Sequence, residues 1–208
     1  MMQRLSRLLR IAQLQFRNLP VNVFFLLLVK SLFKEERILI YGKDLSKDIT
    51  PSQGDDFHEL IFKGELSELE KIRENMVSPP WEYCCHIHDG VRDFFVYKDN
   101  EKIGHISWIY YRNNPNRIMN LSTKQCEIKF CLTLPEHRGR GIYPAVLSKI
   151  QNYLKQKGYA KVFICVKDGN IPSITGIEKV GFSLIAQTKL IKIMGVQLNK
   201  RYSFHESE

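Results

Sequence analysis

Residues 134–144 read LPEHRGRGIYP and lie between a run predicted as a β-strand and one predicted as an amphipathic helix. Gly139 and Gly141 let the backbone turn and approach a ligand closely. The first N–H groups of the helix have no partners within it, and they lie at the positive end of the helix dipole. Arg138 and Arg140 add positive charge at the same place. The stretch therefore predicts a binding site for a phosphate or diphosphate group.

Two familiar nucleotide-binding motifs do not fit this stretch. A P-loop requires G-x-x-x-x-G-K-[ST], and a dinucleotide-binding turn requires G-x-G-x-x-G. Only Gly139 and Gly141 are present here, and Pro144 stands where the second motif has its third glycine. The ligand is therefore expected to carry its diphosphate in another chemical setting.

The segment from Glu127 to Phe182 resembles the GNAT superfamily of N-acetyltransferases. The acetyl-CoA signature of that family, [Q/R]-x-x-G-x-[G/A], follows a strand that carries V-x-P. Here the two elements read TLP at residues 133–135 and RGRGIY at residues 138–143. Tyr143 stands where the family has glycine or alanine. The resemblance implies acetyl-CoA as co-substrate, with its pyrophosphate bound at the signature.

A second landmark of the family, N-x-x-[SA]-x-x-x-Y-x-K-x-G-F, is matched by NIPSITGIEKVGF at residues 170–182. Ile177 occupies the position of the family's tyrosine, whose hydroxyl is thought to protonate the departing thiolate in many members. The resemblance also implies that strand residues before the signature align the pantetheine arm and the thioester. The CoA-binding residues expected from both landmarks are Leu132, Thr133, Arg138, Gly139, Arg140, Gly141, Ile142, Tyr143, Asn170 and Ser173.

Attack on a thioester requires a neutral amine, so a proton acceptor is needed at neutral pH. Glu127 is the first candidate base, because the resemblance places a functional carboxylate at this point of the strand. A two-residue period puts it on one face with Lys129, Cys131 and Thr133, and the alternative is a strand glutamate paired with Lys129. His105 is the second candidate, and its alternative is a hydrogen-bonded structural histidine.

The departing thiolate also needs a proton donor, which Ile177 cannot be. Tyr143 is the candidate for this catalytic role among the hydroxyls near the signature, and the alternative is an aromatic core residue at the start of the helix. Cys131 near the signature is expected to be a small buried thiol, because direct transfer requires no cysteine nucleophile.

The cysteines and histidines do not predict a metal site. Residues 84–88 read CCHIH, but adjacent side chains on a strand point to opposite faces and no second pair of ligands follows at a zinc-finger spacing. The five cysteines form an odd set without a C-x-x-C pair, which favours a reducing compartment over a disulfide framework. The cytoplasm is therefore the expected location.

The net charge of +9 is unevenly distributed, because residues 1–37 carry +5 of it. Residues 1–36 are predicted as a helical appendage in which a basic amphipathic helix precedes the apolar run Val21–Val29. That run is too short to span a bilayer, which requires about twenty apolar residues. The open alternatives are packing on the domain, a dimer contact, or peripheral contact with the inner face of a membrane. The body is only mildly basic, and we expect no nucleic-acid partner.

Residues 37–208 are predicted as one domain. Two-residue and 3.6-residue periods, with their Gly, Pro and Asn boundaries, predict both strands and helices. The strands are 37–41, 82–88, 93–98, 103–110, 127–133 and 161–166, and the helices are 65–76, 142–158 and 170–181. The fold class expected is α/β (α+β), with a mixed, mostly antiparallel sheet flanked by helices. The resemblance adds a V-shaped splay between two strands around the CoA cleft.

The function expected is transfer of an acetyl group from acetyl-CoA to a primary amine by direct attack. The residues around the signature resemble GNAT members associated with bacterial surface-polysaccharide pathways, which implies an amino sugar or a sugar nucleotide as acceptor. Two alternatives stay open. One is an acyl-CoA-binding sensor or scaffold without catalysis, and the other is a basic module that binds a membrane or a nucleic acid.

Overall fold

The computed structural model describes residues 33–46, 55–84, 90, 93–100, 102–115, 117–193, 196–197 and 202. The chain divides into two compact units, Arg37–Thr188 with Lys200–Glu208, and Met1–Glu36 with Lys189–Asn199. Most of the predicted N-terminal appendage lies outside the described residues. Its last four residues, Phe33–Glu36, begin a strand, so the prediction of helix was wrong there.

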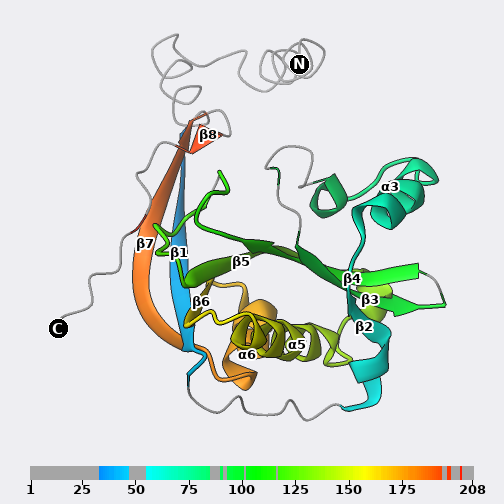
Figure 1. Ribbon diagram of the computed structural model, residues 1–208. Helices are drawn as coiled ribbons and strands as arrows, with labels where there is room; N and C mark the ends of the chain where they lie inside the picture. The colour runs from blue at the N-terminus through cyan, green and yellow to red at the C-terminus, as the bar shows by residue number, and fades with distance from the viewer. Residues whose placement is uncertain are drawn as a thin grey trace, which may run out of the picture. The chain divides into compact units, whose positions relative to one another are not determined.

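In the described part of the chain, eight strands form one sheet in the order β2-β3-β4-β5-β6-β1-β7-β8 (Figure 1). Their bounds are β1 (Phe33–Asp44), β2 (Ile61–Lys63), β3 (Phe94–Asp99), β4 (Lys102–Tyr110), β5 (Gln125–Thr133), β6 (Lys161–Lys167), β7 (Ser183–Ile193) and β8 (Val196–Gln197). The helices are α3 (Leu66–Glu74), α5 (Ile142–Gln156) and α6 (Ile171–Lys179), with the 3-10 helices η1 (Asp55–Leu60), η2 (Trp81–Cys84) and η3 (Pro135–His137). No helix in the described part of the chain is long and apolar enough to cross a membrane.

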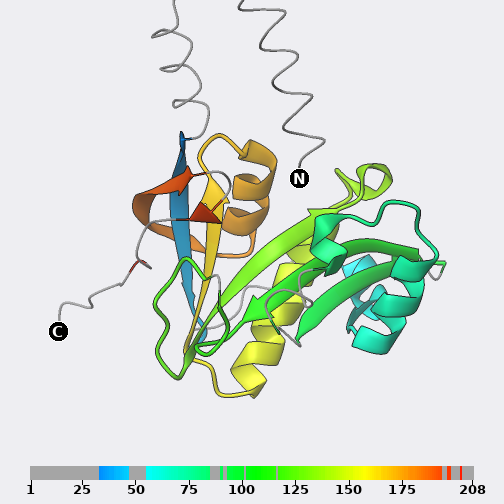
Figure 2. The same ribbon diagram turned by 90° about the horizontal axis from the view of Figure 1, so that it is seen from above.

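The sheet is mixed and mostly antiparallel, which confirms the predicted fold class. β5 and β6 pair in parallel, while β2–β3, β3–β4, β4–β5 and β1–β6 pair antiparallel. β3 and β4 form a hairpin through the turn at Asp99–Asn100. Helices pack on both faces, with α5 and α6 against one apolar cluster and α3 with η2 against another (Figure 2).

The two helices after β5 follow from their sequence. In α5, Val146, Leu147, Ile150 and Leu154 recur at helical spacing and are fully buried. In α6, Pro172 lies in the first turn, where its missing N–H costs no helical hydrogen bond. Asn170 is the N-cap residue of α6, but its side chain makes no capping hydrogen bond.

The predicted strand at 82–88 was wrong over the part that the structure describes. Residues Trp81–Cys84 form η2 instead, and residues 85–89 lie outside the described ranges. Two side chains hold η2 on β4: the Tyr83 hydroxyl donates to the carbonyl of Ile103, and the Trp108 indole N–H donates to the carbonyl of Glu82. These tertiary hydrogen bonds outweigh the alternating pattern of the segment.

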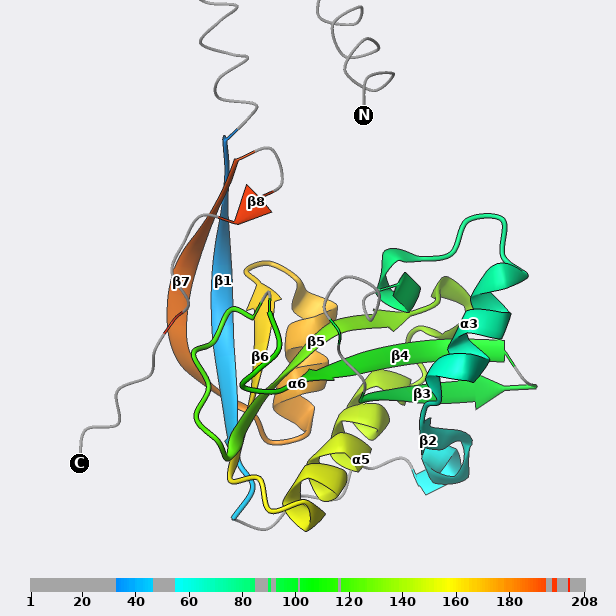
Figure 3. The same cartoon turned by 45° about the horizontal axis from the view of Figure 1, so that its top comes forward.

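A bulge divides β5 into two parts. β6 pairs with β5 only over residues 125–128, and beyond them the two strands diverge (Figure 3). Phe130 has a φ of 49°, a left-handed conformation that is uncommon for a bulky residue, and the register with β4 shifts at this point. The divergence of β5 from β6 is the splay that the resemblance implied.

Candidate functional site

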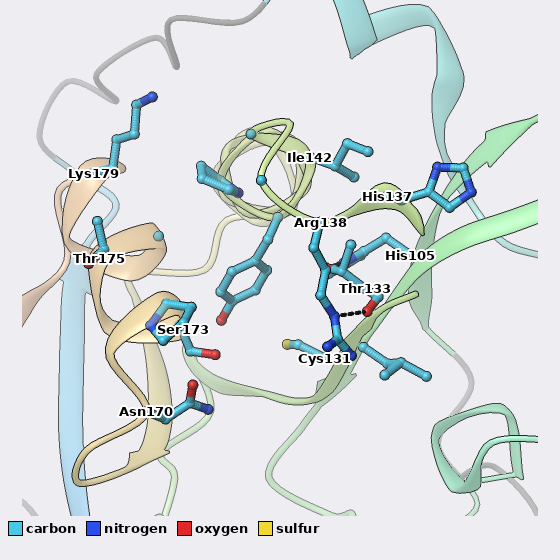
Figure 4. A pocket seen from close by; sticks show the side chains of 17 residues that line it. His105, Cys131, Thr133, His137, Arg138, Ile142, Asn170, Ser173, Thr175 and Lys179 are labelled. Carbon is cyan, nitrogen blue, oxygen red and sulfur yellow. Dashed lines mark hydrogen bonds between the residues drawn. The ribbon is translucent and has the colours of Figure 1, made fainter. Parts of the chain in front are cut away.

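A cavity of about 610 Å³ is lined by the C-terminal half of β5, the loop after it, the start of α5, and α6 (Figure 4). All the predicted CoA-binding residues line it except Arg140. His105 of β4 lines it as well. In Figure 4, Asn170 and Ser173 from the α6 side face Cys131 and Thr133 of β5. The structure therefore brings the two sequence landmarks together around one space.

The loop into α5 presents a series of backbone donors to this cavity. Gly139 and Gly141 have φ angles of 74° and 80°, which favour glycine, and Gly141 is the N-cap of α5. Among the described residues, none of the N–H groups of residues 139–143 donates to a backbone oxygen. Consecutive free N–H groups at the positive end of a helix dipole form a site for an anion.

The two arginines of the signature are placed differently. Arg138 lines the cavity, and its Nε donates to the carbonyl of Thr133 at 3.0 Å. Arg140 pairs with Asp99 at 3.7 Å and lies over the ring of Phe57. Of the two side chains predicted to reach the diphosphate, only that of Arg138 therefore lies at the cavity. The Arg140 side chain instead connects the loop to the β3–β4 hairpin.

A close contact between His137 and Gly104 sets the distance between β4 and the loop that follows β5. The ring of His137 packs against Gly104, where an added Cβ would lie 2.7 Å from a ring carbon. The His137 ring also contacts the ring of Tyr97, with 5.7 Å between the ring centroids. Gly104 is therefore required for space rather than for backbone conformation.

The C-terminal half of β5 offers an open edge to the cavity. Leu132 and Thr133 pair with β4 on one side, whereas β6 has no residue paired with 131–133 on the other. An unpaired strand edge can bind an extended chain of alternating donors and acceptors as an additional strand would. This edge has the geometry expected for the pantetheine arm.

His105 lies at the floor of the cavity, almost fully buried. Its Nδ1 is 2.7 Å from the Thr133 hydroxyl, its Nε2 is 2.7 Å from the Ser107 hydroxyl, and its ring stacks on Tyr143. Burial lowers the pKa of His105 to about 3, so the imidazole is neutral at physiological pH. Ser107 is the contact that the sequence did not reveal, and its position two residues from His105 was the available signal.

Tyr143 lies at the start of α5, against the floor of the cavity. Its ring stacks on that of His105, with 5.5 Å between the ring centroids, and burial raises the pKa of Tyr143 well above its usual value. Burial also raises the pKa of the Cys131 thiol to about 11, so the sulfur carries its proton. The structure thus places the predicted proton donor in the cavity, beside a protonated cysteine.

Glu127 lies away from the cavity, and its predicted neighbours were partly wrong. The bulge at Phe130 reverses the alternation of β5, so Glu127 does not share a face with Cys131 and Thr133. Its carboxylate is fully buried and accepts hydrogen bonds from the N–H groups of Ile118 and Met119. Burial raises the pKa of Glu127. The geometry gives it a structural contact, and its role as a base stays a prediction.

Ile177, at the position of the family's tyrosine, is also absent from the cavity lining. It is fully buried in the cluster between α5, α6 and the sheet. The described residues contain no group of three or more metal-binding side chains. Cys84 belongs to η2, while the rest of the cysteine and histidine run lies outside the described ranges.

Comparisons with known proteins agree with this geometry. A model of the acetyltransferase (GNAT) family matches residues 56–182. A comparison with curated protein sequences gives no match. The fold is similar to a GNAT acetyltransferase from Novosphingobium aromaticivorans, with 15% identity and a TM-score of 0.52 over 75% of this chain and 63% of that one.

Two further structures have similar folds. One is a GCN5-related N-acetyltransferase from Sphaerobacter thermophilus, with 15% identity, a TM-score of 0.51, and coverage of 85% of this chain and 58% of that one. The other is a GCN5-related glucosamine N-acetyltransferase region of a fungal multi-domain GH3 β-N-acetylglucosaminidase, with 15% identity, a TM-score of 0.56, and coverage of 80% and 22%. This chain spans less than two thirds of each of these proteins, and at such identities the similarity concerns the fold alone. The family model, which covers more than half of the sequence, shows that the chain belongs to the GNAT family of acetyltransferases.

Proposed function

We propose that this chain is an N-acetyltransferase that moves an acetyl group from acetyl-CoA to a primary amine by direct attack in a ternary complex. The observation that carries the proposal is the row of free N–H groups at residues 139–143, which opens onto the same cavity as the unpaired edge of β5. A diphosphate donor and an extended arm with a reactive end match these two features.

The coenzyme is held along the length of the cavity. The pyrophosphate accepts hydrogen bonds from the loop amides, and Arg138 adds a charged contact. The pantetheine arm lies along residues 131–133, and Asn170 and Ser173 line the opposite side. A backbone N–H near Leu132 or Thr133 polarises the thioester carbonyl and stabilises the oxyanion of the tetrahedral intermediate.

The reaction forms one carbon–nitrogen bond and breaks one carbon–sulfur bond. The neutral amine attacks the thioester carbon, and the intermediate collapses to release the CoA thiolate, which takes up a proton. Tyr143 is the proposed donor of that proton, because its hydroxyl lies in the cavity and its raised pKa keeps it protonated. His105 is a weak base on its own, because burial disfavours its protonated form.

An amino sugar or a sugar nucleotide is the proposed acceptor. It is supported by the residues of the two landmarks and by the glucosamine acetyltransferase region among the proteins of similar fold. The cytoplasm supplies acetyl-CoA and is the proposed location. Residues 1–36 are the proposed contact with a membrane surface or with a second copy of the chain.

The test is an assay of thiol release from acetyl-CoA with a panel of amino sugars, polyamines, amino acids and peptide N-termini, combined with calorimetry of CoA binding. We expect CoA binding and turnover with at least one amine class. Binding without turnover across the panel would favour the sensor alternative instead. Loss of function on removal of residues 1–34, with a soluble acceptor, would favour the basic binding module.

A further inference from the structure

A short series of hydrogen bonds connects the buried interior of β4 to the cavity. The Ser107 hydroxyl is 2.7 Å from Nε2 of His105, and Nδ1 of His105 is 2.7 Å from the Thr133 hydroxyl. His105 of β4 pairs directly with Thr133 of β5, which explains why their side chains meet. Ser107 is fully buried, whereas Thr133 is partly exposed and lines the cavity (Figure 4). The series therefore has a closed end at Ser107 and an open end at Thr133.

The protons of this series have two possible arrangements, because a neutral imidazole carries a single N–H. Burial lowers the pKa of His105 to about 3, so the ring is neutral at physiological pH. With the proton on Nε2, His105 donates to Ser107 and Thr133 donates to Nδ1, so the hydrogen of the Ser107 hydroxyl needs another acceptor. With the proton on Nδ1, Ser107 donates to Nε2 and His105 donates to the Thr133 oxygen. The hydrogen left over is then that of the Thr133 hydroxyl.

The burial of Ser107 decides between these two arrangements. Among the described residues, the hydrogen bond of the Ser107 hydroxyl goes to His105, and the sulfur of Cys131 in the cavity wall is only a weak acceptor. The Nε2–H form would therefore leave a buried hydroxyl hydrogen without a good acceptor, which is costly. The Nδ1–H form leaves its free hydrogen at Thr133, where the cavity is open. The imidazole therefore carries its proton on Nδ1, and the Thr133 hydroxyl is a donor available to the cavity.

We propose that the Thr133 hydroxyl is a second donor to the oxyanion of the tetrahedral intermediate, and that His105 and Ser107 hold it in that role. The inference rests on the proposed function, in which a backbone N–H of the same strand is the first donor. As the amine nitrogen bonds to the thioester carbon, negative charge develops on the carbonyl oxygen, and the Thr133 O–H donates to that oxygen until the carbon–sulfur bond breaks. No proton changes its owner in this step. The N–H of His105 donates to the Thr133 oxygen, and this polarises the O–H bond and strengthens its hydrogen bond to the oxyanion.

The sequence of this chain departs from the family motif at the proposed donor. Thr133 stands at the position of valine in the V-x-P element. Threonine and valine are both β-branched, so the strand itself does not require a hydroxyl there. Thr133 is a catalytic residue in this proposal, because its hydroxyl touches the reacting oxygen. His105 and Ser107 act through Thr133 and are positioning residues.

The position of the imidazole proton can be measured without turnover. In a chain that carries ¹⁵N-labelled histidine, the NMR signals of the two ring nitrogens distinguish the Nδ1–H form from the Nε2–H form. The spectrum of His105→Gln assigns these signals to His105. We expect the Nδ1–H form at neutral pH. The Nε2–H form would overturn the inference and leave the proposed acetyltransferase intact.

The catalytic role is tested with Thr133→Val and Thr133→Ser on the best amine of the panel. The control is Thr188→Val, which changes a threonine of β7 outside the cavity lining. We expect Thr133→Val to lower kcat about 100-fold, as is usual when one oxyanion donor is removed. The Kd for CoA should stay unchanged, which also shows that the variant folds. Thr133→Ser keeps the hydroxyl and should keep most of kcat, and wild-type kcat in Thr133→Val would overturn the inference.

Ser107→Ala, alone and combined with Thr133→Val, tests the positioning role. Without the Ser107 hydroxyl the imidazole proton is no longer fixed on Nδ1, so we expect kcat to fall about 10-fold in the wild-type background. In the Thr133→Val background the same substitution should change kcat by less than about 2-fold, because the hydroxyl that Ser107 positions is already absent. Equal losses in the two backgrounds would show a packing effect and overturn the positioning role. Absence of turnover with every amine overturns both the inference and the proposed function.

Discussion

The two halves of β5 belong to one strand but differ in their strand partners and in their contact with the cavity. Glu127 and Ile128 pair with both β4 and β6, and Glu127 is buried and bonded to the backbone of a neighbouring loop. Residues 131–133 have no partner on β6 and line the cavity. The difference begins at Phe130, whose left-handed backbone reverses the alternation. The open edge at the cavity therefore arises from an interruption of the strand at Phe130, which is an ordinary strand residue and neither glycine nor proline.

The largest expected effect lies in the N-terminal half. Glu127→Ala leaves the N–H groups of Ile118 and Met119 without their acceptor, at about 1 to 3 kcal/mol for each buried group. We expect the free energy of unfolding in urea to fall by roughly 2 to 6 kcal/mol. Glu127→Gln keeps one acceptor oxygen and should lose less. If Glu127→Gln instead unfolds like the wild type but loses most of its kcat, Glu127 is a base after all.

The C-terminal half is tested through Arg138, which binds the carbonyl of Thr133 and lines the cavity. Arg138→Ala removes a charge-assisted phosphate contact of about 1.5 to 3 kcal/mol, so the Kd for CoA should rise roughly 10- to 150-fold. Arg140→Ala is the matched variant, since Arg140 is engaged with Asp99. Its effect should stay within about 1 kcal/mol, as for an exposed ion pair. Equal effects in calorimetry would mean that both arginines reach the diphosphate.

The burial of His105 beside Thr133 makes the stability of the folded chain sensitive to acid. The pKa of His105 is lowered to about 3 in the folded chain, so the unfolded chain binds a proton first as pH falls below about 6.5. The free energy of unfolding therefore falls as the pH is lowered from 6.5 to 3, and the loss is about 2 kcal/mol at pH 5. In His105→Gln this part of the loss between pH 7.5 and pH 5 should vanish. The measurement is the free energy of unfolding in urea for both proteins at pH 7.5 and pH 5. An equal fall in the two proteins would refute this role of His105.

The smallest expected effect concerns the bulge itself. At an ordinary strand position, glycine is less stable than alanine by about 0.5 to 1 kcal/mol, and Ile128 provides such a position. At Phe130 the order should reverse, because alanine pays about 1 kcal/mol for the left-handed conformation. The measurement is the difference in unfolding free energy between Phe130→Gly and Phe130→Ala, compared with the same pair at Ile128. The same order at both positions would argue against the bulge.

Local patterns were sufficient to predict most elements and the loop between β5 and α5. The glycines of the signature, Pro144 and the apolar spacing of α5 each act over a few residues, so sequence alone predicts them. The bulge could not be predicted, because Phe130 carries no glycine or proline signal and its conformation depends on the neighbouring strands. That one residue made the assignment of Glu127 to the face of Cys131 wrong. η2 was missed for the same kind of reason, since Trp108 and Tyr83 hold it by tertiary hydrogen bonds.

The missing side chain at Gly104 has a consequence for the proposed acetyl transfer. The His137 ring occupies that space and holds the loop that contains residues 139–143 close to β4. Because the pantetheine arm has a fixed length, the proposed complex depends on this separation to bring the thioester to Thr133 while the pyrophosphate lies at the loop. A methyl group at position 104 would increase the separation, so a coenzyme bound at its pyrophosphate would hold its reactive carbon away from Thr133.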